Sequence, residues 1–129
     1  MGAFDFGYFK KKVNRKLKIK KKGRSLSNKY AAWKLDKDYY DGNRNDGYGG
    51  FTYDGRWLKI LPKIIKRYNL SNKSKILDLG CKKGFIMKDL KILLPKAKVW
   101  GIEDHIYPIK KAEKEIKSKI IQSKYYNIP

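Results

Sequence analysis

The sequence has 129 residues, which is the length of a single domain. Its 33 basic and 12 acidic residues give a formal net charge of +21, and such a surplus attracts nucleic acid, anionic lipid or acidic partners. Of the basic residues, 28 are lysine and five are arginine. Phosphate-binding surfaces favour the bidentate arginine, so a bias in overall composition is an alternative explanation of the charge.

Cysteine and histidine each occur once. A single cysteine excludes an internal disulfide, and the two residues together are too few soft ligands for a zinc site, so we predict no metal. No apolar run approaches the ~18 residues of a membrane span, and the N-terminus lacks the apolar core of a signal peptide. These features predict a cytoplasmic protein.

Residues 1–24 are predicted to form a basic N-terminal arm. Between residues 10 and 24 there are ten basic residues and no acidic one. Phe9, Val13 and Leu17 recur at helical spacing, so a helix over this arm would be amphipathic. Such a helix can lie on an anionic membrane or contact RNA phosphates, while the alternative is a solvated, lysine-rich segment.

Residues 25–74 are predicted to be a loop and helical lead-in. Glycine, asparagine and aspartate are dense in residues 36–55, which favours turns over regular structure. The aspartates at 36, 38 and 41 lack the spacing and closing glutamate of a calcium loop. Asp54 is expected to cap a helix that Pro62 either kinks or restarts. The apolar side of this helix carries Trp57, Leu61, Ile64, Ile65 and Tyr68.

Residues 75–129 follow a strand–helix–strand–helix–strand pattern. An apolar run over 75–79 contains Asp78, and a turn with Gly80 and Gly84 leads into a helical pattern over 85–94. A second apolar run ends at Glu103, 19 residues after Gly84. A helix over 108–117 and a strand over 119–123 complete the pattern. We therefore predict an α/β fold with a parallel, Rossmann-like half-sheet behind the N-terminal extension.

The turn differs from the common phosphate-binding loops. A dinucleotide fingerprint requires glycine at 82 and 85, where this chain has Lys82 and Phe85. A P-loop requires lysine and then serine or threonine after the last glycine, and here Phe85 follows Gly84. The remaining pattern is an acid near the end of the strand, followed by glycines two and six residues later.

Residues 76–84 resemble the first motif of the Rossmann-like (class I) S-adenosylmethionine-dependent methyltransferases, and they match three of its four fixed positions. Residues 101–103 resemble the second motif of that family. Residues 48–57 are similar to the segment before the domain in small bacterial methyltransferases of this class. The resemblance covers roughly residues 47–129.

The resemblance implies that S-adenosylmethionine is the cofactor. Asp78 would favour its cationic amino group and sulfonium, and Gly80 and Gly84 would let the backbone turn close to the ligand. Glu103 would accept hydrogen bonds from the ribose hydroxyls, and Arg56 would bind the carboxylate. Each of the two acids has an alternative role as a helix cap, and Arg56 as a surface residue.

For other residues near the turn, the sequence predicts burial, exposure or charge without a role in binding the cofactor. Cys81 is expected to be a small buried side chain, and His105 an exposed loop residue. On the helix after the turn, Asp89 is expected on the polar face. Lys82 occupies the position of the middle glycine of the motif, and the positive charges of Lys82 and Lys83 are expected to repel a sulfonium.

Three strands leave an open sheet edge and an uncovered face, so we expect a truncated or inactive copy, or a partner chain that completes the sheet. In the family, the substrate pocket and the usual catalytic residues follow the third strand. We therefore assign no catalytic residue and no methyl acceptor. The alternative function is a basic, non-enzymatic module that retains the fold and binds RNA or anionic surfaces weakly and without specificity.

Overall fold

The computed structural model describes residues 23–125. The predicted basic helix around Phe9, Val13 and Leu17 lies outside the described residues. The lead-in contains α1 (Leu26–Lys34), α2 (Lys37–Asp41), the 3₁₀ helix η1 (Arg56–Lys59) and α3 (Leu61–Arg67). The sheet region contains β1 (Lys75–Leu79), α4 (Phe85–Leu93), β2 (Lys98–Glu103), α5 (Ile106–Lys110), α6 (Lys114–Lys117) and β3 (Ile120–Gln122).

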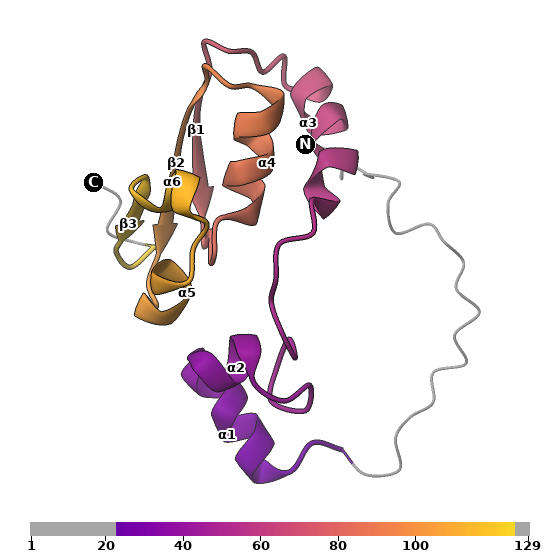
Figure 1. Ribbon diagram of the computed structural model, residues 1–129, viewed down its shortest axis with the longest axis vertical. Helices are drawn as coiled ribbons and strands as arrows, with labels where there is room; N and C mark the ends of the chain where they lie inside the picture. The colour runs from indigo at the N-terminus through magenta and orange to yellow at the C-terminus, as the bar shows by residue number, and fades with distance from the viewer. Residues whose placement is uncertain (1–22, 126–129) are drawn as a thin grey trace, which may run out of the picture.

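The three strands form one parallel sheet in the order β1-β2-β3. Asp78 pairs with Gly101 in the first register, and Glu103 pairs with Gln122 in the second. This arrangement confirms the predicted α/β fold class and agrees with a Rossmann-like topology. The carboxyl ends of the strands point toward α5 and toward the end of the molecule that holds α2 (Figure 1).

The core lies between the sheet and α3, α4 and α6. Met87 and Leu90 of α4 pack in one buried cluster with Val99 of β2 and Ile116 of α6. The helix starts and ends close to its predicted bounds. Asp89, however, is fully buried instead of lying on a polar face, because the lead-in covers that side of α4: Tyr53 donates its hydroxyl hydrogen to the Asp89 carboxylate.

The prediction of one continuous helix over 108–117 is wrong, because the structure has two separate short helices, α5 and α6, in this region. Glu113 is extended at the break, with φ −58° and ψ 134°. Its N–H donates to the Lys83 carbonyl at 3.4 Å, and its carboxylate pairs with Lys88 at 2.6 Å. These contacts hold the chain against the turn and α4, and a continuous helix would not make them.

Pro62 starts a new helix, which is one of the two outcomes expected from the sequence. It lies in the first turn of α3, where its missing N–H costs no hydrogen bond. Leu61 is buried as predicted, but Tyr68 is 57% exposed and does not belong to the core-facing side. The turn-rich segment also contains one short helix, α2, which Asp36 caps through the N–H of Asp38.

One face of the sheet is only partly covered within residues 23–125: Ile102 on the central strand is buried, but its neighbours on β1 and β3 are exposed. Leu77 and Leu79 alternate with Ile76 and Asp78, and they are 44% and 53% exposed; Ile121 on β3 is 41% exposed. β1 is also an edge strand of the sheet. Across the described part of the chain, no helix has the length and apolar character needed to cross a bilayer.

Candidate functional site

The turn after β1 alternates between ordinary and left-handed backbone. Gly80, Lys82 and Gly84 have φ values of 73°, 54° and 76°. The N–H groups of Gly80 and Cys81 both donate to the Ile102 carbonyl, which ties the turn to β2. Lys82 therefore adopts a conformation that disfavours any residue with a Cβ atom. The backbone at position 82 thus has the left-handed conformation typical of glycine, although the residue there is lysine.

The two glycines of the turn have different surroundings. A Cβ atom on Gly84 would meet the Ile116 side chain at 2.1 Å, so Gly84 lets α6 pack against the turn. A Cβ atom on Gly80 would meet only Tyr125, at 3.7 Å. Gly80 is therefore the glycine that leaves space for a ligand.

A pocket of about 220 Å³ lies beside this turn at the carboxyl end of β1. Of the five predicted cofactor-binding residues, it brings together Asp78, Gly80 and Arg56, whereas Glu103 and Gly84 are not among its lining residues. The remaining walls are mainly aromatic or aliphatic: Tyr48, Phe51, Trp57, Cys81, Lys82, Phe85 and Ile86. The pocket is therefore an apolar space with a few charged groups at its boundary, as ligand sites usually are.

Asp78 is half-buried at the pocket, and one oxygen of its carboxylate is fully buried. Its Oδ2 atom is inaccessible to solvent and has no hydrogen-bond partner. Burial, together with the nearby negative charge of Glu103, raises the pKa of Asp78 to about 6. A buried acceptor without a donor is costly, so this oxygen is suited to a cationic or hydrogen-bonding ligand.

Asp89 is the other described carboxylate with a buried oxygen that lacks a partner. Its Oδ1 accepts the Tyr53 hydroxyl, while Oδ2 has no donor. Asp89 lies on α4 and does not line the pocket of Asp78. It therefore provides a comparison residue with the same chemistry at a different place.

Glu103 is 1% exposed and holds the turn through its carboxylate. Oε2 accepts the backbone N–H of Lys82 at 3.0 Å, and Oε1 accepts the backbone N–H of His105 at 3.0 Å. The His105 ring nitrogen Nδ1 lies 3.1 Å from the same Oε1. His105 is thus half-buried beside Glu103 and is not a freely exposed loop residue. The role of Glu103 toward a ribose remains a prediction.

Arg56 lines the pocket and pairs with Asp54 at 2.8 Å. Both side chains are about half exposed, so the pair is weak and can exchange for a ligand anion at little cost. Asp54 also accepts the Arg56 backbone N–H at 3.1 Å. The predicted capping role of Asp54 is nevertheless wrong, because Gly55 is the N-cap of η1 and no side chain caps this helix.

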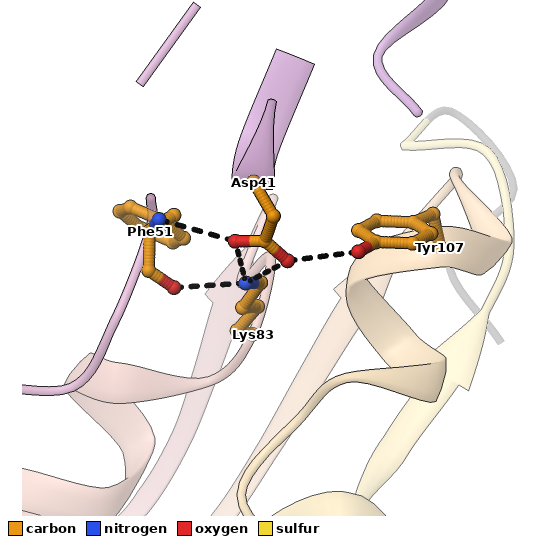
Figure 2. Close-up of polar contacts among 4 residues, drawn as sticks. All are labelled: Asp41, Phe51, Lys83 and Tyr107. Atoms are coloured by element: carbon orange, nitrogen blue, oxygen red, sulfur yellow. Dashed lines mark hydrogen bonds and ion pairs between the residues drawn. The ribbon is translucent and has the colours of Figure 1, made fainter. Parts of the chain in front are cut away.

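Lys83 is 5% exposed and does not line the pocket of Asp78. Its Nζ lies 2.6 and 2.8 Å from the two carboxylate oxygens of Asp41 and 2.8 Å from the Phe51 carbonyl, as Figure 2 shows. Tyr107 donates its hydroxyl hydrogen to the same carboxylate at 2.8 Å. Asp41 neutralises this ammonium, so the structure gives no support to the expected repulsion between Lys83 and a sulfonium. These four residues form what we call the Asp41–Lys83 clamp.

Lys82 lies at the pocket boundary beside aromatic rings. Its Nζ donates to the Tyr48 hydroxyl and lies 4.9 Å from the centre of the Tyr48 ring and 5.8 Å from that of Phe51. Tyr40 stacks on Tyr48 with ring centres 5.9 Å apart, and Phe51 stacks on Phe85 of α4 at 4.7 Å. The density of tyrosine in residues 39–53 was the only sequence signal for this packing.

The arrangement can bind a small ligand that has a cationic group next to an aromatic or apolar part. Asp78 would face the cation, and the rings would exclude water from it. Among residues 23–125 there is no group of three or more metal-ligating side chains. Comparison with known protein families finds no family that matches this chain, and comparison with curated proteins finds no match.

Proposed function

We propose that this chain is an S-adenosylmethionine-dependent methyltransferase, or an inactive copy of one, that binds the cofactor in the pocket of Asp78. The observation that carries the proposal is the unpartnered, buried Oδ2 of Asp78 beside the turn. Further support comes from the backbone at residues 80, 82 and 84, which is left-handed at the three positions where the motif places glycine.

The pocket residues fit the amino-acid end of this cofactor. A volume of about 220 Å³ is below the ~300 Å³ at which drug-sized ligands are usually enclosed, so the adenosine part would extend beyond the pocket. Asp78 would hold the ammonium group, and Arg56 would leave Asp54 for the carboxylate. When bound, the cofactor supplies a methyl group on a sulfonium, and the walls formed by Tyr48 and Phe85 would keep water away from it.

Lys82 would oppose this binding. Two like charges about 6 Å apart at an effective dielectric of 20 repel each other by roughly 3 kcal/mol, and solvent reduces that value. The hydrogen bond from Lys82 to Tyr48 keeps the ammonium at the pocket boundary. We therefore expect weak affinity for the cofactor, and the methyl acceptor is left unassigned.

A partner chain that completes the sheet belongs to the same proposal. Parallel sheets are normally covered on both faces, and Leu77 and Leu79 are exposed on one. The free edge of β1 would accept a further strand. Such a partner would supply the acceptor side of the active site.

Calorimetric titration tests the cofactor site. Wild-type protein should bind both S-adenosylmethionine and S-adenosylhomocysteine, and Asp78→Asn should weaken S-adenosylmethionine binding by about 1.5–3 kcal/mol, the value of a hydrogen bond to a charged group. Asp89→Asn is the matched control, because Asp89 is the other carboxylate with a buried oxygen that lacks a partner, and it lies outside the pocket. Equal losses in the two variants, or no binding by the wild type, would contradict the proposal.

The net charge of +21 favours a second candidate function, a basic module that binds polyanions. This function needs neither Asp78 nor a cofactor. Its signature is binding to anionic surfaces that falls steeply as salt increases. A chain that binds no S-adenosylmethionine yet shows this salt dependence would favour the second candidate over the first.

A further inference from the structure

Helix α1 has one face that packs on the protein. The half-buried residues of α1 and its end are Asn28, Ala31, Ala32 and Leu35, which recur on one side of a helix. Asn28 donates to the Asp46 carboxylate at 2.7 Å, and this contact fixes the rotation of α1 about its axis. Ser25 caps the first turn through the Asn28 N–H. The helix therefore has a defined outer face.

That outer face is apolar and exposed. Leu26, Tyr30 and Trp33 are 84%, 57% and 76% exposed, and their spacing of four and three residues aligns them opposite the packed face. The rings of Tyr30 and Trp33 stack on each other with centres 6.1 Å apart. We call these three residues the α1 stripe.

Positive charge borders the α1 stripe. At 3.6 residues per turn, Lys29 lies on one side of it and Lys34 on the other, and the Lys34 ammonium lies 4.7 Å from the centre of the Tyr30 ring. Helix α1 contains no acidic residue. In the sequence, the ten basic residues of the segment 10–24 come directly before it.

We propose that the α1 stripe inserts into the interfacial region of an anionic lipid bilayer, with the flanking lysines on the headgroups. Tryptophan and tyrosine favour this region, the leucine one turn before them adds apolar burial, and lysines extend to anionic headgroups. The helix would lie in the plane of the surface, with its Asn28 side toward the protein. This proposal assigns a surface to the second candidate function and does not depend on cofactor binding.

Other occupants fit the α1 stripe less well. Single-stranded RNA needs open ring faces for its bases, but Tyr30 and Trp33 stack on each other and Leu26 has no ring. A second copy of the chain would bring together two molecules that each carry +21. An anionic lipid surface matches both the apolar stripe and the charge around it.

Co-sedimentation with vesicles tests this proposal. The full chain should bind vesicles of phosphatidylcholine and phosphatidylserine and should not bind phosphatidylcholine alone. Tyr30→Ser with Trp33→Ser should lower binding by about tenfold. Tyr68→Ser is the matched control, because Tyr68, which directly follows α3, is also 57% exposed and lies outside the stripe, so the variant should bind like the wild type. Unchanged circular dichroism would show that the variants are folded.

Three results would overturn the proposal. Equal vesicle binding by the stripe variant and the wild type would assign the binding to lysines alone. Loss of RNA binding in the stripe variant, with vesicle binding retained, would make the stripe a nucleic-acid surface. A wild-type dimer in light scattering that the stripe variant dissociates would make it a self-association surface. Cofactor titration of the same variants distinguishes each result from failure of the cofactor site.

Discussion

Lys82 is held in a backbone conformation that its side chain disfavours. The left-handed region costs a residue with a Cβ atom roughly 1–2 kcal/mol, and glycine avoids that cost. The Lys82 N–H donates to Glu103, and its Nζ donates to Tyr48, so contacts at both ends keep the residue in place.

We predict that Lys82→Gly is more stable than Lys82→Ala by about 1 kcal/mol. Both variants lose the contact with Tyr48, so their difference isolates the backbone cost. Chemical denaturation measures it. The same pair of changes at Lys66, inside α3, should give the opposite order, because glycine destabilises a helix by about 1 kcal/mol relative to alanine. Alanine equal to or better than glycine at position 82 would show that the turn is not left-handed there.

Asp78 makes stability depend on pH. Its folded pKa of about 6 lies above the ordinary value of 3.8, so the folded state holds the proton more tightly than the unfolded state. The contribution of this group to stability is therefore greatest below pH ~4 and is lost as the pH rises to about 6. The loss is on the order of 3 kcal/mol, because each unit of pKa difference corresponds to ~1.4 kcal/mol.

Asp78→Asn should remove this dependence. The variant should be more stable than the wild type at pH ~7 by about 2 kcal/mol, and the two should converge near pH ~4. Urea denaturation across this pH range measures the difference. If the difference in unfolding free energy between the wild type and Asp78→Asn were the same at both pH values, Asp78 would be solvated.

The Asp41–Lys83 clamp joins α2 and its loop to the turn after β1. Lys83 is 5% exposed, so its ammonium depends on Asp41 and the Phe51 carbonyl for compensation. Burial raises the pKa of Asp41, but hydrogen bonds from Lys83 and Tyr107 outweigh burial and lower the pKa overall. The lead-in is thus fixed to the sheet by a partly buried ion pair as well as by stacked rings.

We predict that Asp41→Asn costs about 3 kcal/mol of unfolding free energy, because it leaves a buried ammonium without its counter-ion. Lys83→Met should cost less, since Asp41 keeps its bonds to Tyr107 and the Phe51 N–H. The double variant should be more stable than the sum of the two losses implies, which a double-mutant cycle measures. Additive losses would exclude direct coupling between the two side chains.

At the scale of the whole molecule, residues 23–125 cover one face of the sheet fully and the other face only in part. Leu79 on the open face is 53% exposed, and Leu90 in the core is 4% exposed. Leu90→Ala should cost about 3 kcal/mol, and Leu79→Ala less than about 1 kcal/mol, because only the first opens a cavity. Thermal unfolding of the isolated chain measures both. A large cost at Leu79 would mean that another part of the molecule covers this face.

The sequence predicted the sheet well because strands and helices have distinct apolar periods. It also predicted the turn, since Gly80 and Gly84 are needed where the backbone is left-handed. The break between α5 and α6 could not be predicted, because it depends on contacts of Glu113 with Lys83 and Lys88, far away in the sequence. Periodicity reports only local preference.

The charged residues near the site show the same limit. Asp41 has no predicted role in the sequence, and Lys83 is expected to repel a sulfonium, yet the two side chains neutralise each other across 42 positions of sequence. Asp89 has the helical position of a surface residue and is buried by Tyr53 from the lead-in. Sequence patterns identified which residues are charged but not which of them are paired.

The most direct test of the central proposal is calorimetric titration with S-adenosylmethionine at pH ~6 in two buffers of different ionisation enthalpy. A cationic group bound at Asp78 would lower the pKa of this carboxyl, so binding should release a fraction of a proton. We predict binding heats that differ between the buffers for the wild type and agree for Asp78→Asn. An absence of binding, or equal heats in both buffers for the wild type, would contradict a cofactor site at Asp78.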